Sequence, residues 1–285
     1  MRKLAWCLTA RPVPEIRSAI CDFQGNGEMR IFAMLLVFQG SLCTQDPFEI
    51  HVYEYDPLPR GKFTYEAHNN YVVHGSTAAA GLLAPMNHQV HFTSELTAGI
   101  TEWFRAAAVI LTARRPDQGL EYAGFRVLPH LYAPSSRHLP LTLGLVAEFS
   151  FQPAAYAENA RTIELRTIVE KHIGRLELDA NPAFGRALRG GDSNAGWSFE
   201  PEGRMGWRVS NSLTPSIEYY SSWGSIGGLP PIRDQIHQIV PGADVRIRDR
   251  VTWNFGVGFG LTPQGSGVIM KSRFEVRFGK AHRRR

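Results

Sequence analysis

The stretch Val251–Leu261, with the sequence VTWNFGVGFGL, alternates strictly between two kinds of side chain. As a strand it places valine, tryptophan, phenylalanine and leucine side chains on one face, and threonine, asparagine and glycine on the other. A water-soluble β-sandwich would bury the apolar face, whereas a membrane β-barrel would expose it to lipid. The environment of these two faces therefore decides the fold class.

The same alternation recurs along most of the chain after residue 60. Short turns alternate with longer loops rich in glycine, proline or asparagine, as in membrane barrels, although PSSRHLP is long for a turn and TPQG is short for a loop. The sequence thus predicts an all-β fold, an antiparallel transmembrane β-barrel of about 12 strands over residues 62–279. The expected strands lie near 62–74, 87–99, 102–114, 121–134, 141–151, 162–172, 174–188, 197–209, 214–224, 236–248, 250–262 and 267–279.

Tryptophan positions give a second indication of a bilayer, because five indoles fall at strand ends. We interpret them as two aromatic girdles at the lipid–water interfaces, with Trp103, Trp207 and Trp253 at the short-turn ends and Trp197 and Trp223 at the long-loop ends. Arginine and carboxylate residues are nearly balanced on the polar face, which is typical of a lumen where charges pair across strands. We therefore expect the small face of 251–261 to point inward, its glycines leaving room for larger charged neighbours.

The N-terminal region has the features of an export signal. A basic residue precedes the apolar run IFAMLLVF at 31–38, which is too short to span a membrane, and small residues follow it. We predict a signal peptide at 29–43, cleaved after Cys43, and a spurious or disordered extension at 1–28. The alternatives are a lipoprotein anchor at Cys43 and a buried strand or helix at 31–38.

The regions that flank the expected barrel are interpreted from composition. Segment 44–61 contains FEIHVYEYDP and forms either a periplasmic segment, a plug in the lumen or an extension of the first strand. The net charge is +5, but the only basic run is the tail 280–285, so we expect a solvated end and no nucleic-acid partner. The chain has no cysteine after residue 43, which agrees with export.

The last expected strand carries alternating apolar residues, Phe274, Val276 and Phe278, after Gly267, and GKAHRRR follows it. This pattern resembles the C-terminal strand signal of bacterial outer-membrane barrels, which usually ends the chain. The segments FEIHVYEYDPLPRGKFTYEAHNNYV, ELTAGITEWF and VTWNFGVGFGLT are similar to those of uncharacterised barrels related to the outer-membrane proteins found with aromatic-degradation pathways. The resemblance implies a place in the bacterial cell outer membrane, with its lipid bilayer and the barrel insertion machinery as partners, and passage of small solutes.

One cluster of polar residues is a candidate site. Pairing of the first two strands about the loop near Ala80 sets Asn70 opposite His91 and Glu66 opposite Glu95. Two carboxylates so close repel one another unless a cation of the closing strand intervenes. We interpret the cluster as a structural lumen network, with a Ser–His or two-carboxylate active site as the alternative. Its members are Glu66, His68, Asn70, His91, Glu95, Lys271, Arg273 and Glu275.

Three function classes follow from these observations. The first is a non-enzymatic barrel, either structural or serving as a narrow channel or partly plugged transporter for small solutes, with no catalytic residue and no cofactor. The second is an outer-membrane enzyme acting on lipid or lipopolysaccharide through His68, His91 and Glu95, and the third is a secreted soluble β-sandwich. We expect no metal site, because His88 and His91 would diverge on a strand.

Overall fold

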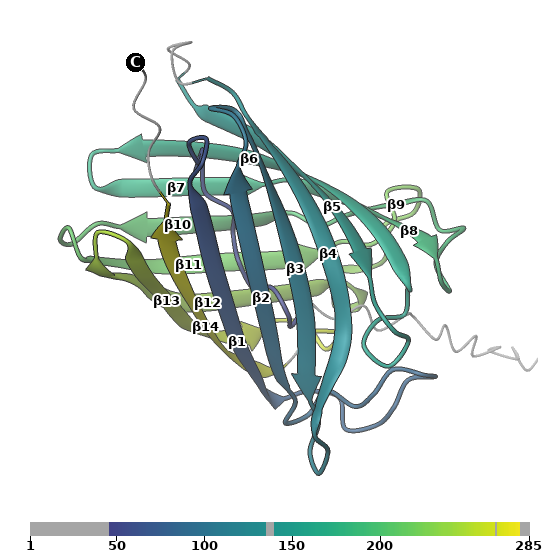
Figure 1. Ribbon diagram of the computed structural model, residues 1–285. Helices are drawn as coiled ribbons and strands as arrows, with labels where there is room; N and C mark the ends of the chain where they lie inside the picture. The colour runs from purple at the N-terminus through teal and green to yellow at the C-terminus, as the bar shows by residue number, and fades with distance from the viewer. Residues whose placement is uncertain (1–45, 135–139, 266, 280–285) are drawn as a thin grey trace, which may run out of the picture. The chain divides into compact units, whose positions relative to one another are not determined.

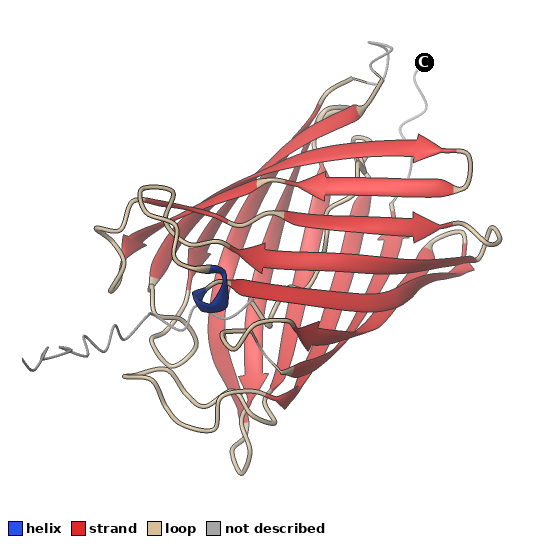
Figure 2. Ribbon diagram, turned by 180° about the vertical axis from the view of Figure 1, so that it is seen from behind, coloured by secondary structure: helices blue, strands red, loops and turns tan. Residues whose placement is uncertain are grey.

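The computed structural model describes residues 46–134, 140–265 and 267–279. The predicted extension at 1–28, the signal peptide at 29–43 and the basic tail at 280–285 lie outside the described residues. No helix in the described segments is long and apolar enough to cross a membrane. The short 3-10 element η2 (Ile232–Asp234) is visible in blue in Figure 2.

Strands make up most of the described chain because long stretches alternate apolar and polar side chains (Figure 1). Ten strands run without interruption: β1 (Phe63–His74), β2 (Val90–Gly99), β3 (Phe104–Arg114), β4 (Leu120–Tyr132), β5 (Thr142–Phe151), β6 (Arg161–Ile173), β11 (Leu213–Ser222), β12 (Ile236–Arg248), β13 (Val251–Gly260) and β14 (Val268–Phe278).

The two remaining spans are each interrupted next to a proline. Pro182 separates β7 (Leu176–Asn181) from β8 (Ala183–Arg189), and both strands pair with β6. Pro201 lies between β9 (Trp197–Phe199) and β10 (Glu202–Trp207). Because proline has no N–H to donate, each interruption breaks the hydrogen-bond ladder without ending the span.

Antiparallel pairing closes the sheet into a barrel. Each span pairs with the next, β5 pairs with β6, and β14 returns to β1 with Phe63 opposite Phe278. Counting β7 with β8 and β9 with β10, the barrel has twelve spans, which confirms the predicted strand number. A closed ring of this kind is not a β-sandwich, so the soluble β-sandwich interpretation is wrong.

The connections define two ends of the barrel. The short-turn end carries the connections 100–103, 133–141, 174–175, 208–212 and 249–250. The long-loop end carries the connections 75–89, 115–119, 152–160, 190–196, 223–235 and 261–267. In outer-membrane barrels the short turns face the periplasm and the longer loops face the outside.

The two faces of the strands are polar inside and apolar outside, the reverse of a water-soluble fold. On β13, Asn254 points inward and is 4% exposed, whereas Phe259 on the other face is 43% exposed. On β14, Lys271 is 4% exposed and Phe274 is 39% exposed. The apolar face of VTWNFGVGFGL therefore points outward, where a bilayer would cover it.

The inward glycines of β13 have neighbours of two kinds. A Cβ atom at Gly258 would lie 2.7 Å from Ile269 Cγ2 and 3.0 Å from Gln238 Nε2. A Cβ atom at Gly256 would lie 2.9 Å from Val240 Cγ1. Gly256 lies opposite Lys271, which pairs with Glu218 across β13 and β12, so this glycine does have a charged neighbour, whereas Ile269 and Gln238 lie beside Gly258.

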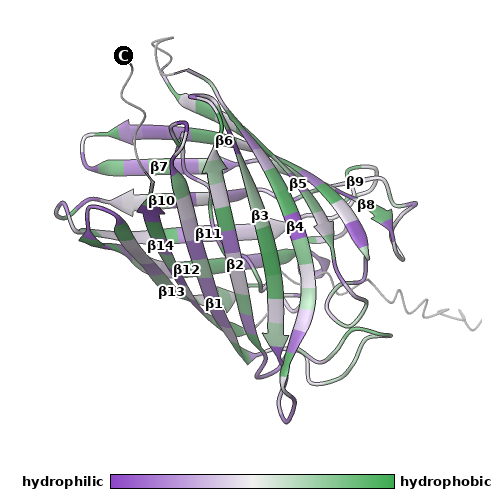
Figure 3. Ribbon diagram, in the orientation of Figure 1, coloured by the Kyte–Doolittle hydropathy of each residue, from purple (hydrophilic) through white to green (hydrophobic). Residues whose placement is uncertain are grey.

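The lumen also has an apolar wall. Strand β3 is apolar on both faces and is mostly green in Figure 3. Its inward residues join those of β4 to β6 in a buried cluster with Phe48 and Tyr53 from the N-terminal segment. The wall residues in this cluster are Ala107, Val109, Leu111, Ala113, Ala123, Leu128, Tyr132, Val146 and Ile168.

Candidate functional site

Residues 46–59, which we call the inner segment, lie within the barrel and form no strand. At the long-loop end, Pro47 lies beside residues of three loops. At the other end, Pro59 O accepts a hydrogen bond from Lys62 N, next to the β2–β3 turn. Most side chains between these points are buried, with Phe48 at 1% and Val52 at 1% exposure. The segment therefore runs along the lumen from one end to the other and does not extend β1.

Inward side chains of the wall satisfy the backbone of the first half of the inner segment. Asn70 Nδ2 donates to Pro47 O at 2.8 Å, and Thr93 Oγ1 donates to Phe48 O at 2.7 Å. Lys271 Nζ donates to Ile50 O at 3.2 Å. A backbone without a strand partner needs such donors when it is buried.

The second half of the segment is held in the same way from the opposite side of the lumen. Asn181 accepts from Tyr53 N at 2.6 Å and donates its Nδ2 to Tyr53 O at 3.0 Å. Glu170 accepts from Tyr55 N at 2.8 Å. Side chains from β1, β2, β6, β7 and β14 thus replace a hydrogen-bond ladder around one extended chain.

Acidic side chains of the inner segment pair with arginines of the wall. Arg126 on β4 contacts Asp46 and lies 3.1 Å from Glu49. Arg204 on β10 lies 3.3 Å from Glu54. The Arg126 pairs are charge-assisted and lie in a narrow lumen, where they fix the path of the segment.

Asp56 is the last acidic residue of the inner segment and contacts two arginines near the short-turn end. Its carboxylate lies 2.8 Å from Arg105 Nη1 and 3.0 Å from Arg277 Nη1. Every acidic residue of the segment therefore has an arginine partner on the wall.

The predicted strand register is confirmed. Glu66 pairs with Glu95, and Asn70 pairs with His91. Arg273 Nη1 lies 2.8 Å from Glu66 Oε2, so a cation of the closing strand does intervene beside the two carboxylates.

The remaining members of the predicted lumen network have other partners. Lys271 pairs with Glu218 of β11 and does not contact Glu66. Glu275 lies 3.6 Å from Arg273 and accepts from Arg277, and Glu95 accepts from Thr97 at 2.7 Å. The eight predicted residues thus belong to several separate contacts within the described part of the lumen.

The histidines of the cluster lack the geometry of a catalytic base. His68 Nε2 lies 3.7 Å from Glu66, beyond hydrogen-bond range. His91 packs edge-on against Phe48 at 4.6 Å between ring centroids, and neither of its nitrogens has a hydrogen-bond partner among the described residues. Among the described residues, His91 therefore has no nucleophilic side chain within hydrogen-bond distance that it could activate as a base. In the described segments, no group of three or more His, Cys, Asp or Glu residues has the geometry to hold a metal ion.

The arginine with the most carboxylate partners in the described lumen, Arg204, was not among the predicted site residues. Arg204 has 4% side-chain exposure and contacts Asp179 at 3.0 Å, Asp244 at 2.5 Å and Glu177 at 3.4 Å, in addition to Glu54. The signal for it was present in the sequence as acidic residues in FEIHVYEYDP and an inward arginine on a strand. The cluster around Arg204 could be predicted only on the assumption that the inner segment enters the lumen.

Protonation of the inner segment differs from that of free side chains. The Glu54 side chain is 41% exposed inside the lumen, and its removal from bulk water raises its pKa to about 8, against the lowering effect of Arg204, with Asp244 and Asp179 adding to the rise. Burial, together with the positive charge of Arg273, holds the pKa of the His51 imidazole well below its usual range, so that His51 is neutral. Burial raises the pKa of Tyr53, whose hydroxyl donates a hydrogen bond to Glu49.

Comparison with solved structures identifies the fold. The COG4313 outer membrane channel from Pseudomonas putida F1 aligns with 81% of this chain and 100% of its own, with a TM-score of 0.56 and 13% identity. The NanC porin aligns with 76% of this chain and 99% of its own, with a TM-score of 0.48 and 8% identity. This chain has an outer-membrane β-barrel fold. No protein-family model matches the sequence, and no curated protein does.

On this outer-membrane barrel the predicted girdle residues occupy both ends. Trp103 and Trp207 are 51% and 52% exposed at the short-turn end, where Trp253 stacks on Phe274 at 5.5 Å between ring centroids. Trp197 and Trp223 are half-buried at the long-loop end. Contact of these indoles with a lipid interface stays a prediction.

The predicted C-terminal signal residues lie on the outer face of the barrel. Phe274, Val276 and Phe278 are 39%, 37% and 43% exposed on the last strand. Their recognition by insertion machinery stays a prediction.

Proposed function

We propose that this barrel, which lies in the bacterial outer membrane, is a narrow, non-enzymatic channel for small solutes whose lumen is constricted by the inner segment acting as a plug. One observation carries this proposal: the inner segment crosses the lumen while side chains from opposite walls bond its backbone. Twelve strands make a barrel wider than the small filled ones and narrower than open porins. A single extended chain therefore takes up much of the bore.

Side-chain contacts hold the plug in the lumen, and it does not form a strand of the sheet. Its backbone makes no strand ladder, and its acidic side chains pair with wall arginines through side chains alone. Passage of a solute is then limited to the space beside the plug or to states in which the plug has shifted.

The outer surface supports the membrane partners of this proposal. Its large apolar side chains, such as Phe259 and Met270, are exposed around the barrel as lipid would require. We assign Phe274, Val276 and Phe278 to recognition by the insertion machinery because they form the outer face of the last strand.

The test compares conductance with and without the plug. The chain starting at residue 44 and the chain starting at Arg60, each behind a heterologous signal sequence, are reconstituted in planar bilayers. We expect small conductance from the first and several-fold larger conductance from the second, because the lumen gains the volume of the segment. Heat-modifiable migration on a gel checks that both barrels are folded. Large and equal conductances of the two folded proteins would contradict the plug.

A further inference from the structure

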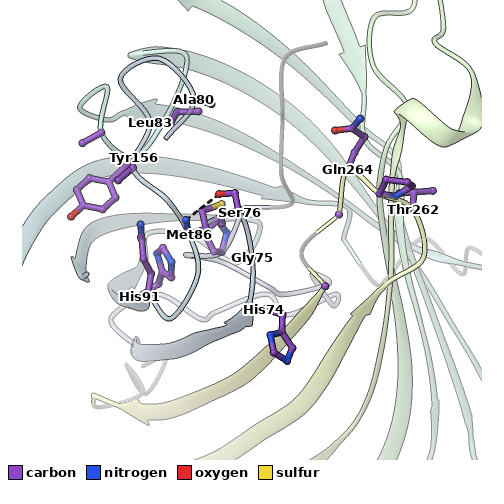
Figure 4. A pocket seen from close by; sticks show the side chains of 17 residues that line it. His74, Gly75, Ser76, Ala80, Leu83, Met86, His91, Tyr156, Thr262 and Gln264 are labelled. Carbon is purple, nitrogen blue, oxygen red and sulfur yellow. Dashed lines mark hydrogen bonds between the residues drawn. The ribbon is translucent and has the colours of Figure 1, made fainter. Parts of the chain in front are cut away.

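A cavity of about 410 Å³ opens at the long-loop end, beyond the ion pairs of the lumen. The β1–β2 loop, the β5–β6 loop and the β13–β14 loop surround it, and Pro47 of the inner segment lies at its base. Figure 4 shows His91 and Tyr156 on one side of the opening, and Thr262 and Gln264 on the other. The cavity has the size of small-molecule sites in proteins.

The cavity wall is mainly apolar and carries no acidic residue, lysine or arginine among its described lining residues. Its apolar side chains are Pro47, Ala80, Leu83, Ala84, Met86, Ala155, Tyr156 and Pro263. An ion placed here would lose its hydration without meeting a counter-charge. The lining therefore favours an uncharged molecule with a large apolar part.

Four polar atoms of three residues on this lining have no hydrogen-bond partner in the described structure. Gln89 is 1% exposed, and its Oε1 is unpaired although its Nε2 donates to Pro85 O at 2.6 Å. His91 is 2% exposed, with both ring nitrogens unpaired. Gln264 Oε1 is also unpaired. A buried polar atom without a partner costs about 1–3 kcal/mol, so these atoms favour a ligand that pairs with them.

The geometry points to a binding site for a small, uncharged, mainly apolar molecule that carries a hydroxyl group, held by Gln89 and His91. A hydroxyl donates one hydrogen bond, which suits Gln89 Oε1, and accepts another, which suits the N–H of a neutral imidazole. The apolar part of the ligand packs among Leu83, Met86 and Tyr156. This inference rests on the proposed function for one point alone, that the bound molecule is a solute on its way into the lumen.

Methionine methyl groups give a direct readout of binding. In the chain that starts at residue 44, the only methionines are Met86 in the cavity and Met205 and Met270, which face outward and are each 50% exposed. The barrel, labelled with ¹³C at the methionine methyls and held in lipid nanodiscs, is titrated with cyclohexanol. We expect a saturable shift at Met86 and only a linear, partition-driven drift at Met205 and Met270.

Matched probes and variants test the assigned hydrogen bond. Cyclohexanone has the same ring but no donor, so we expect it to bind about three- to tenfold more weakly than cyclohexanol. In Gln89→Leu this preference should disappear, because the acceptor is gone. Cyclohexanecarboxylate, an anion at pH 7.5, should give no saturable shift at Met86.

A second variant locates the site without altering a strand. Ala155→Trp places an indole in the cavity from the β5–β6 loop, and it should abolish the saturable shift while heat-modifiable migration is kept. Saturable binding that survives Ala155→Trp, a linear Met86 response to cyclohexanol, or tighter binding of the carboxylate would each overturn the inference. None of these results depends on conductance, so a failure here is distinct from a failure of the plug.

Discussion

The two ends of the inner segment are held in different environments. At the long-loop end, Arg126 is 4% exposed and bridges Asp46 to Glu49, whose side chain is 5% exposed. At the short-turn end, Asp56 is 24% exposed, and one of its partners, Arg277, is 46% exposed. The pair of Arg126 with Glu49 is thus buried, the pair of Asp56 with Arg277 is close to water, and Asp46 and Asp56 are themselves 34% and 24% exposed.

This difference follows from how the chain is connected. At the short-turn end the segment continues through Pro59 directly into β1, so the chain itself keeps that end in place. At the long-loop end, Asp46 and Glu49 are held by side-chain contacts with Arg126. Removing one partner of a buried ion pair costs about 3–5 kcal/mol, whereas an exposed pair contributes about 0–1 kcal/mol. We therefore expect the buried end to be the stronger anchor of the inner segment.

The largest effect is expected from Arg126→Met. The variant leaves the buried carboxylates of Glu49 and Glu148 without a cation, and we expect docking of the segment to weaken by about 3–5 kcal/mol. A cysteine at Val52, which is 1% exposed, reports the change, because the chain has no other cysteine after residue 43. Its reaction with a water-soluble maleimide should accelerate roughly 10²- to 10³-fold.

The matched control for this experiment is Arg115→Met. Arg115 pairs with Glu121 near the β3–β4 loop and makes no ion pair or hydrogen bond with the described inner segment. It should leave the reaction rate at Val52→Cys unchanged. Equal acceleration in both variants would show that any lost arginine loosens the barrel, and that Arg126 is not an anchor.

A smaller effect is expected from Phe48→Ala, which tests the apolar side of the same anchor. Phe48 is 1% exposed, packs against His91 and Tyr156, and belongs to the cluster of the apolar wall. Loss of its ring should weaken docking by about 2–4 kcal/mol, since water can partly refill the space that a dry core would leave empty. Phe48→Leu, which keeps most of the apolar volume, should show less than half of the acceleration at Val52→Cys.

The middle of the segment gives a prediction about pH. The pKa of Glu54 is raised to about 8 from its ordinary value of 4.5, so the docked segment holds the proton more tightly than the released one. Docking is therefore strongest at low pH, weakens as pH rises from 4.5 towards 8, and levels off above it. Maleimide reaction at Val52→Cys, normalised to a cysteine in an exposed loop, should increase between pH 6 and pH 8. In Glu54→Gln the profile should be flat, and an unchanged slope would assign the dependence to another group.

The alternation of apolar and polar side chains was sufficient to predict the barrel, because this two-residue period can be detected in each strand from its own sequence. The apolar and polar faces of β13 and β14 could be predicted from their own residues, and the closure between β14 and β1 follows from an even number of antiparallel strands. The β1–β2 register could be predicted too, since the loop near Ala80 fixes which residues face each other. The face assignments and the β1–β2 register are local relations, whereas the closure follows from the strand count, and all three are confirmed.

The contacts of the candidate site join side chains on different strands, and the alternation within one strand does not predict such contacts. Alternation assigns Lys271 to the lumen but cannot choose between Glu66 and Glu218, which lie on different strands. It also misses the apolar wall, because β3 is apolar on both faces and has no period to detect. The path of the inner segment is set by contacts with strands more than a hundred residues away, such as that between Tyr53 and Asn181.

The smallest effect is expected at the tethered end, from Arg277→Gln. Asp56 keeps Arg105, which is 6% exposed at its side chain and lies 2.8 Å away, and Arg277 itself is close to water. We expect docking to change by about 0–1 kcal/mol, which is at most a severalfold change in the reaction of Val52→Cys, and the effect should shrink further in high salt. An acceleration as large as that of Arg126→Met would mean that the covalent connection through Pro59 does not hold this end. The segment would then be anchored at both ends by charge, and the contrast between buried and exposed pairs would not explain how the plug is retained.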